Sequence, residues 1–401
     1  MLKLFALCHI LRFTRNFLNT HAVSGFTHSK RTKEDSVMQN AVEHYQVIIV
    51  GAGPSGAACA KVLHDAGVSA LILEKESLPR YKICSGVLFG QTQELLKKYF
   101  SAEPPADVYC EPRTISASHI VEWSRDKGFI PYSWELPKDG HAFPDVYYNV
   151  WRHKFDHWLV QQSNVLVREN CLVRGFSQQG KTITVNIFRK DLKLLEPPGG
   201  NPNQILTCDY LVGADGGSSS KIRNILDPVW FNQANMVVIY QVYCPVKDMG
   251  SLRDGNWNVF FEPQIGEMLS CAHRKDAYFT LCVGGFKGRD LQAGMETFKT
   301  FLKNKFHVAL EQEERVEGCM LREATPHLGT GNVLVTGEAA GFMYLNGEGI
   351  SAAIDSGYRA GQALAQAIKQ GGDALEFYRQ NTADILQHIQ LCRQKAHFLS
   401  V

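Results

Sequence analysis

Residues 45 to 56 read Tyr45-Gln-Val-Ile-Ile-Val-Gly51-Ala-Gly53-Pro-Ser-Gly56. The first half is a β-branched apolar run of the kind that is buried in a parallel sheet. In the second half, Gly51 permits a tight turn and Gly53 lets a pyrophosphate approach the backbone. Gly56 lets the following helix pack close to the sheet. The stretch therefore predicts a strand, a phosphate-binding turn and the start of a helix.

The residues that follow complete a βαβ unit. Residues 57–64 predict a helix that ends by Gly67, residues 68–73 predict a second strand, and Glu74 stands at the end of that strand. There its carboxylate can accept hydrogen bonds from a ribose diol, while the helix N-terminus favours phosphate. In this context the motif predicts dinucleotide binding. The alternative is a strand–turn–helix whose glycines serve packing alone.

Composition and length favour a globular protein with a nucleotide-binding and a substrate-binding domain. The chain has 401 residues, of which 45% are hydrophobic and 20% are charged. Its net charge is +2, and no basic stripe predicts a nucleic-acid partner. The 11 cysteines form no C-x-x-C pair, which favours reduced thiols and no metal site. No apolar run reaches the roughly 18–20 residues of a membrane span.

The first 33 residues stand apart because they hold six basic residues and no acid. This composition is typical of an organelle transit peptide, and residues 4–17 could also form an amphipathic helix on a membrane surface. The other interpretation is an upstream start, with Met38 opening the folded chain. We therefore expect a cytoplasmic protein, with peripheral membrane contact as an option, or organelle import if the extension is a genuine transit peptide.

Two further glycine-rich turns follow apolar strands. The first reads Tyr210-Leu-Val-Gly213-Ala-Asp215-Gly216, and it places Asp215 at a carboxyl end of the sheet, where ligands bind. The second begins at Val333 and contains Gly337 and Glu338, whose carboxylate can accept from a polyol hydroxyl. Each turn alone is common in proteins that bind no ligand there.

The second of these turns continues through Gly347-Glu-Gly349-Ile350 into a helix expected over residues 350–370. Gly347 and Gly349 would let backbone N–H groups at the helix start face oxygen or nitrogen atoms of a ligand. The alternative is a helix that packs closely through small residues.

The order and spacing of the three motifs, over about residues 45–370, resemble the FAD-binding pattern of the p-hydroxybenzoate hydroxylase-like superfamily. NAD-type Rossmann enzymes lack the second and third motifs, so the resemblance implies FAD. It also implies an α/β fold, with a Rossmann-type FAD-binding domain of the glutathione-reductase-2 type, an inserted, mostly β substrate domain and C-terminal helices. The superfamily usually has Asp at position 338, and Glu338 shifts the reach of the carboxylate by one methylene.

We expect the FAD-binding domain to be discontinuous, with residues 41–105, 146–225 and 325–372. Residues 106–145 and 226–324 would form the substrate-binding domain. Residues 1–40 would be an N-terminal extension, and residues 373–401 would form a C-terminal helical tail.

Two segments narrow the resemblance to geranylgeranyl reductase-like flavoproteins. Leu78-Pro-Arg80-Tyr-Lys-Ile-Cys84-Ser85-Gly86 resembles their P-R-x-K-x-C-G-G loop, with Ser85 in place of a glycine. Arg152-His-Lys-Phe-Asp156 is similar to their R-x-x-F-D helix, whose arginine lies near the flavin. The Trp and Phe-Pro-Lys cluster of that family is not clearly present. Its neighbourhood holds Trp257, Phe260, Phe261 and Pro263 without the lysine.

The resemblance implies two candidate catalytic positions, Cys84 and Gly349. Cys84 would lie by the isoalloxazine ring and gate substrate or supply a proton, and water held at the Gly349 turn is the other proton source. A lone cysteine is otherwise a small buried hydrophobe. The implied cofactor-binding residues are Gly51, Gly53, Pro54, Ser55, Gly56, Glu74, Lys75, Arg80, Cys84, Ser85, Gly86, Arg152, Asp215, Gly216, Gly337, Glu338, Gly347, Gly349 and Ile350.

The implied activity is that of an FAD-dependent oxidoreductase. It would reduce carbon–carbon double bonds of a prenyl or other hydrophobic substrate by hydride transfer from flavin N5. NAD(P)H or ferredoxin would donate the electrons. One alternative is an FAD-dependent monooxygenase that hydroxylates an aromatic or other small molecule. A halogenase is disfavoured because no W-x-W-x-I-P tract is present. An alternative of another class is a non-catalytic flavin-binding resistance or regulatory factor.

Overall fold

The computed structural model describes residues 42–121, 130–131, 146–190, 202, 204–233, 236–262, 264–268, 270–322, 325–344 and 347–399. From Val42 onward these residues form one compact unit. The basic extension, Pro263 and the side chain of Phe261 lie outside the described residues.

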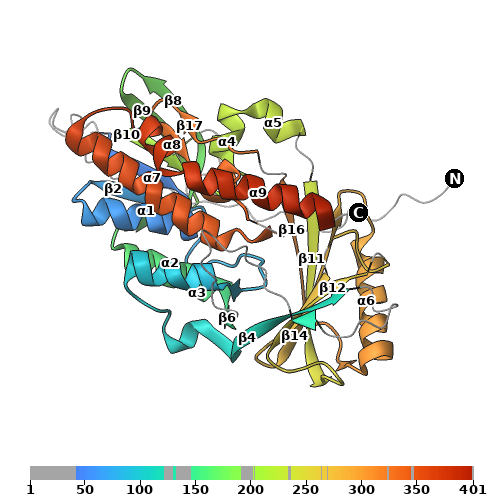
Figure 1. Cartoon of the computed structure of the whole chain (residues 1–401). Helices are drawn as coiled ribbons and strands as arrows, with labels where there is room; N and C mark the ends of the chain where they lie inside the picture. The colour runs from blue at the N-terminus through green and yellow to red at the C-terminus, as the bar shows by residue number, and fades with distance from the viewer. Residues whose placement is uncertain are drawn as a thin grey trace, which may run out of the picture. The chain divides into compact units, whose positions relative to one another are not determined.

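A mainly parallel sheet carries the three glycine-rich turns (Figure 1). Its strand order is β17-β18-β10-β1-β2-β7, and the strands from β18 to β7 run parallel. An antiparallel pair, β8 and β9, extends it from β10. The strands are β1 (His44–Val50), β2 (Ala70–Leu73), β7 (Leu166–Arg168), β8 (Cys171–Gln179), β9 (Thr182–Arg189), β10 (Gln204–Gly213), β17 (Gly329–Thr330) and β18 (Val333–Val335).

Helix α1 packs beside α7 and also against α3 (Figure 1). Glycines allow this close approach. A Cβ on Gly357 would lie 2.1 Å from the Ser55 carbonyl oxygen, and one on Gly361 would lie 2.7 Å from that of Cys59. The helices are α1 (Pro54–Asp65), α2 (Gly90–Phe100), α3 (Arg152–Ser163), α4 (Lys221–Leu226), α5 (Pro228–Gln233), α6 (Leu291–Phe306), α7 (Ile350–Gln370), α8 (Ala374–Asn381) and α9 (Ala383–Leu399), with 3-10 helices η1 (Ala106–Val108) and η3 (Gly337–Ala340).

A second, mainly antiparallel sheet has the order β15-β11-β14-β13-β12-β4-β6-β3, with β16 paired to β11 and β5 to β4. One pair, β12 and β4, is parallel. The strands are β3 (Val87–Leu88), β4 (Tyr109–Val121), β5 (Ile130–Pro131), β6 (Val146–Val150), β11 (Met236–Asp248), β12 (Asn256–Phe261), β13 (Ser270–Lys275), β14 (Tyr278–Phe286), β15 (Ala309–Leu310) and β16 (Arg315–Arg322).

Helix α6 covers one face of this second sheet (Figure 1). Phe298 of α6 makes an edge contact with Phe260, at 5.1 Å between ring centroids, and Phe279 belongs to the same core cluster. Phe260 is thus a core residue. Because side chains alternate along a strand, Thr280 and Cys282 lie on the face away from α6. That opposite face carries the side chains that reach the candidate site.

The apolar segments beside the glycine turns were predictable. The structure confirms the strand at 45–50 as part of β1 and the helix over 350–370 as α7. Helices α2 and α6 had no counterpart among the expected elements. For α6 the signal was available, because its buried residues recur at helical spacing, as Leu291, Met295, Phe298 and Leu302 show. Among the residues described, no helix combines the length and apolarity that crossing a bilayer requires.

Candidate functional site

The three motif turns lie together at one edge of the parallel sheet. Strands β1, β10 and β18 are neighbours, and their carboxyl ends are level. The Ala214 N–H donates to the Val50 carbonyl at 2.9 Å, and the Thr336 N–H donates to the Gly213 carbonyl at 2.9 Å. Ligands of open parallel sheets bind outside the carboxyl ends of the strands.

The glycines of the first turn differ in what surrounds them. Gly51 has φ +110°, and a Cβ there would lie 2.4 Å from the Ala214 carbonyl oxygen. A Cβ on Gly56 would lie 2.0 Å from the Gly51 carbonyl oxygen. By contrast, a Cβ on Gly53 would meet only the end of the Arg80 side chain, at 3.4 Å. Gly51 and Gly56 are required by the turn itself, whereas Gly53 leaves backbone open for a ligand.

Buried hydroxyls join the third turn to the first. Ser55 of α1 donates to Thr336 Oγ1 at 3.1 Å, and the Thr336 hydroxyl donates to Ser356 Oγ at 3.1 Å. Ser356 Oγ also accepts the Gly337 N–H at 3.1 Å. These contacts fix Ser55 and Gly337 relative to each other before any cofactor binds.

Glu338 lies between the second turn and the Cys84 loop, which comprises residues 78–86. Its Oε1 would be 2.7 Å from a Cβ on Gly217, which follows Gly216 of the second motif. Its Oε2 is 3.4 Å from Lys82 Nζ. The extra methylene of Glu338, compared with the aspartate usual in the superfamily, extends its carboxylate toward both neighbours.

A chain of alternating charges connects the first motif to helix α3. Glu74 Oε2 accepts from the Ala52 N–H at 3.0 Å and from Arg80 Nε at 2.9 Å. Arg80 Nη1 lies 3.3 Å from Asp156 Oδ2, and Arg152 Nε donates to Asp156 Oδ1 at 2.6 Å. All four charged side chains are largely buried, with exposed fractions of 13% or less. Residues separated by about 80 positions are thus held as one network.

Cys84 stands next to Arg152. Burial lowers the pKa of the Arg152 guanidinium, but Asp156 and then Cys84 raise it by more, so this cation stays charged. The Gly86 N–H donates to Cys84 Sγ at 3.4 Å. The Cys84 sulfur thus has both the Arg152 guanidinium and a backbone N–H group as neighbours.

Strand β13 fixes the Cys84 loop through a lysine that the sequence patterns did not indicate. Lys275 Nζ donates to the Ser85 carbonyl at 2.9 Å, to the Val150 carbonyl at 2.7 Å and to Asn149 Oδ1 at 3.0 Å. Burial lowers the pKa of Lys275. The sequence signal that could have indicated Lys275 is its position on the same face of the strand as Cys271 and His273, since the three are alternate residues.

His273 contacts the same loop. Its Nε2 lies 3.1 Å from the Ser85 carbonyl oxygen, its Nδ1 is buried without a hydrogen-bond partner, and the residue is fully shielded from solvent. Burial first, and then the Lys275 charge, lower the pKa of His273 to about 3. The imidazole is therefore neutral in the folded protein at neutral pH.

This environment predicts an acid-sensitive fold. The unfolded protein binds a proton at His273 below about pH 6.5, whereas the folded protein does not until about pH 3. Stability should therefore fall as pH decreases through that window. Relative to His273→Gln, the wild-type unfolding free energy should decrease by about 1.4 kcal/mol per pH unit. Urea unfolding from pH 7 to pH 4.5 measures it, and parallel curves for the two proteins would contradict it.

A polar cluster binds the Cys84 loop to strands β11 and β16. The hydroxyls of Tyr81 and Tyr243 are 3.0 Å apart, and Gln241 Nε2 donates to Tyr243 Oη at 2.8 Å. The Arg315 guanidinium lies 3.5 Å from the Tyr81 ring centroid and forms an ion pair with Glu317. This part of the second sheet therefore presents hydroxyl, amide and charged groups.

Other expected site residues occupy three kinds of position. Gly216, at φ +78°, and Gly347, at φ +84°, would each have no atom within 4 Å of an added Cβ, so their backbone is open. Asp215 instead uses its carboxylate to accept from Ser220 Oγ and the Lys221 N–H, both at 2.6 Å, at the start of α4. Lys75 is exposed at the end of β2.

The first backbone N–H groups of α7 are capped by a side chain from the turn that precedes the helix. Glu348 Oε1 accepts the N–H groups of Ile350 and Ser351, each at 2.9 Å. These two amides are thus engaged. Gly349 remains open, since a Cβ there would meet only the Gly347 carbonyl oxygen at 4.0 Å.

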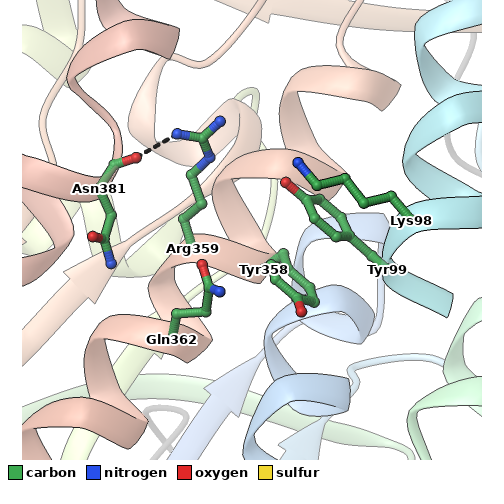
Figure 2. Close-up of a pocket in the computed structure, with 6 residues that line it drawn as sticks. All are labelled: Lys98, Tyr99, Tyr358, Arg359, Gln362 and Asn381. Atoms are coloured by element: carbon green, nitrogen blue, oxygen red, sulfur yellow. Dashed lines mark hydrogen bonds between the residues drawn. The ribbon is translucent and has the colours of Figure 1, made fainter.

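A separate hollow of about 410 Å³ lies among α2, α7 and α8 (Figure 2). The Tyr99 and Tyr358 rings stack at 3.7 Å along its wall, and Arg359 donates to the Asn381 carbonyl. Arg359 also pairs with Asp355. None of the lining residues belongs to the motif turns, so the hollow is distinct from the site described above.

Comparison with known proteins identifies the family. The family model described as an FAD binding domain matches residues 44–390. The chain belongs to this family. This flavoprotein therefore takes FAD as its cofactor, and it is a member of the FAD-dependent oxidoreductase and monooxygenase superfamily. Its residues fit that cofactor, because Gly53 leaves the first turn open and Glu74 presents a buried acceptor beside it.

The flavoprotein is also similar to a curated relative, protein CbrA of Escherichia coli O157:H7. The two are 28% identical over 327 residues, which span 79% of this chain and 82% of CbrA.

Solved structures share the fold at lower identity. A geranylgeranyl bacteriochlorophyll reductase-like protein of Thermoplasma acidophilum has a TM-score of 0.69 at 16% identity, covering 90% of this chain and 87% of that one. The flavin-dependent halogenase CmlS has a TM-score of 0.66 at 18% identity, covering 88% and 64%. Aklavinone-11 hydroxylase with FAD and aklavinone has a TM-score of 0.62 at 17% identity, covering 89% and 71%. The flavoprotein thus has a fold used by reductases, halogenases and hydroxylases.

Proposed function

We propose that this flavoprotein is a reductase that saturates a carbon–carbon double bond of a prenyl or other hydrophobic substrate. The observation that carries the proposal is the Cys84 loop, which lies beside Arg152 and is fixed by Lys275. Adding hydrogen across an alkene needs a proton donor held at one place, because an isolated alkene is poorly polarised. Hydroxylation by flavin and O₂ adds oxygen to the substrate and places no proton on an alkene carbon.

FAD, when bound, supplies hydride at its N5 position. The chain's own residues then have distinct roles. The open backbone at Gly53 and the N-terminus of α1 hold the pyrophosphate, and Glu74 accepts from ribose hydroxyls. Cys84 holds a proton on Sγ for the carbon next to the one that receives hydride. Arg152 stabilises the thiolate that remains.

Hydroxylation of an aromatic small molecule is the second candidate function. The polar cluster of Tyr81, Tyr243 and Arg315 favours it, because these groups suit a phenol or a carboxylate better than a bare prenyl chain. For either function, NAD(P)H or reduced ferredoxin is the proposed electron donor. A flavin-binding factor without turnover is the alternative outside enzymes.

The test begins with the visible spectrum of the purified full chain. A yellow protein is then reduced anaerobically and mixed with a prenylated lipid in D₂O. We expect reoxidation that depends on the lipid, with solvent-derived deuterium on both carbons of each double bond lost, because the N5 hydrogen of reduced flavin also exchanges with solvent. The Cys84→Ser variant should bind FAD normally but reoxidise about 10- to 100-fold more slowly, since it lacks the acidic donor.

Two outcomes would favour another candidate function, and a third concerns Cys84 alone. Reoxidation by O₂ with an oxygen atom added to an aromatic compound would favour the hydroxylase. No product with either substrate class would favour the non-catalytic factor. Unchanged turnover in Cys84→Ser would remove the proposed role of Cys84.

A further inference from the structure

Glu348 has one engaged and one unsatisfied carboxylate oxygen. Its Oε1 accepts the two amides that open α7, whereas its Oε2 is shielded from solvent and has no hydrogen-bond partner. An ionised carboxylate oxygen left in this way is costly, because burial disfavours the charged form. A helix cap alone does not explain it, since a cap at an exposed turn leaves the second oxygen in water.

The groups that face Glu348 come from three elements. Arg152 of α3 contributes positive charge, Ser351 of α7 contributes hydrogen bonds, and Tyr344 of the preceding loop lies close enough to sense the carboxylate charge. Burial raises the pKa of Glu348 to about 7, although the Ser351 and Ile350 amides and Arg152 act to lower it. Both protonation states are therefore accessible near neutral pH.

We propose that Glu348 takes up a proton when the bound FAD is reduced and returns it when the flavin is reoxidised. The inference rests on the proposed function and on the expected position of the flavin ring beside Cys84, which stands next to Arg152, whose charge also acts on Glu348. A two-electron donor adds two electrons and one proton to the flavin, leaving a negative charge on its pyrimidine ring. A second proton then passes from solvent to Oε2 of Glu348.

The physical reason is repulsion between two buried negative charges. Like charges at close range in a site of low dielectric raise each other's proton affinity. Arg152 cannot remove this repulsion alone, because its guanidinium already pairs with Asp156. Protonating Glu348 leaves one anion beside one cation, and the hydroxyl formed on Oε2 gains the ability to donate a hydrogen bond.

The test is the pH dependence of the midpoint potential of the FAD-loaded full chain, which gives the protons taken up per two electrons. We expect close to two protons just above pH 7 for the wild type and one for Glu348→Gln, whose amide keeps the same shape. Asp355→Asn is the matched control, since Asp355 is a buried acid of α7 that is paired with Arg359 beside the separate hollow. It should behave as the wild type does.

Infrared difference spectra provide a second readout, which detects the proton in the wild type directly and uses the variant only to assign the band. On reduction the wild type should gain the C=O band of a protonated carboxylic acid, shifted in D₂O, and Glu348→Gln should lack it. One proton per two electrons in the wild type, or two in both proteins, would overturn the inference. So would the absence of the band. Failure of the chain to bind FAD would contradict the proposed function as well. The proton counts and the missing band named above would contradict only the role of Glu348.

Discussion

Replacing Gly56 by alanine is expected to reduce FAD affinity by at least about 100-fold and to destabilise the apoprotein by about 1–3 kcal/mol. The new methyl group would lie 2.0 Å from the Gly51 carbonyl oxygen, which is backbone and cannot rotate away. Either the turn or α1 must move, and each movement displaces the N–H groups that face the pyrophosphate. Flavin absorbance, FAD titration and urea unfolding measure these effects.

Gly53→Ala is the matched control for that experiment. At Gly53 the added methyl meets only the end of the Arg80 side chain, at 3.4 Å, and the backbone is extended, with φ −88°. The apoprotein should therefore keep its stability to within about 0.5 kcal/mol. FAD binding should still weaken, because the methyl occupies the approach of the pyrophosphate. Equal FAD affinity in Gly56→Ala and wild type would show that this turn does not hold the cofactor.

Replacing Lys275 by methionine is expected to lower the unfolding free energy by about 3 kcal/mol. The change removes three short hydrogen bonds and leaves the Val150 carbonyl and Asn149 Oδ1 buried without that donor. The Ser85 carbonyl keeps its contact with His273. We also expect a shift in the flavin spectrum, because the Cys84 loop loses the hydrogen bond between Lys275 and the Ser85 carbonyl.

Lys247→Met provides the control for the loss of one positive charge. Lys247 is exposed and pairs with Glu311 at the surface, so its replacement should change stability by less than about 0.5 kcal/mol. Urea unfolding of both variants compares them directly. If Lys275→Met were as stable as Lys247→Met, the hydrogen bonds of Lys275 would not hold the loop in place.

The parallel sheet and its turns were predictable because their signals are local. Each strand is a short apolar run, and each turn is marked by glycines at positions such as Gly51, where the φ angle is +110°. The FAD prediction followed from the order of the three motifs along the chain, and the family comparison confirms it. Glu74 could be placed because a strand end fixes its position.

The partners of the Cys84 loop were not predictable, because they are set by strand pairing in the second sheet. Lys275 and His273 reach Ser85 across about 190 positions of sequence. They are placed there by the pairing of β13 with β12, of β12 with β4, and of β4 with β6. For Asp215 the position could be predicted, but the partner of its carboxylate could not. Its position after β10 was evident, but a local hydrogen bond to Ser220 engages its carboxylate, and no pattern distinguishes that contact from one with a ligand.

The contact between α1 and α7 has a consequence for how fast the cofactor can associate. Gly357 and Gly361 let the two helices meet backbone to backbone, and these helices begin at the first and third motif turns. The two turns therefore cannot separate by side-chain rearrangement. An apoprotein whose two binding turns are already fixed loses little conformational entropy on binding. Uptake of FAD should then be a single, concentration-dependent phase, without a slower step for ordering the turns.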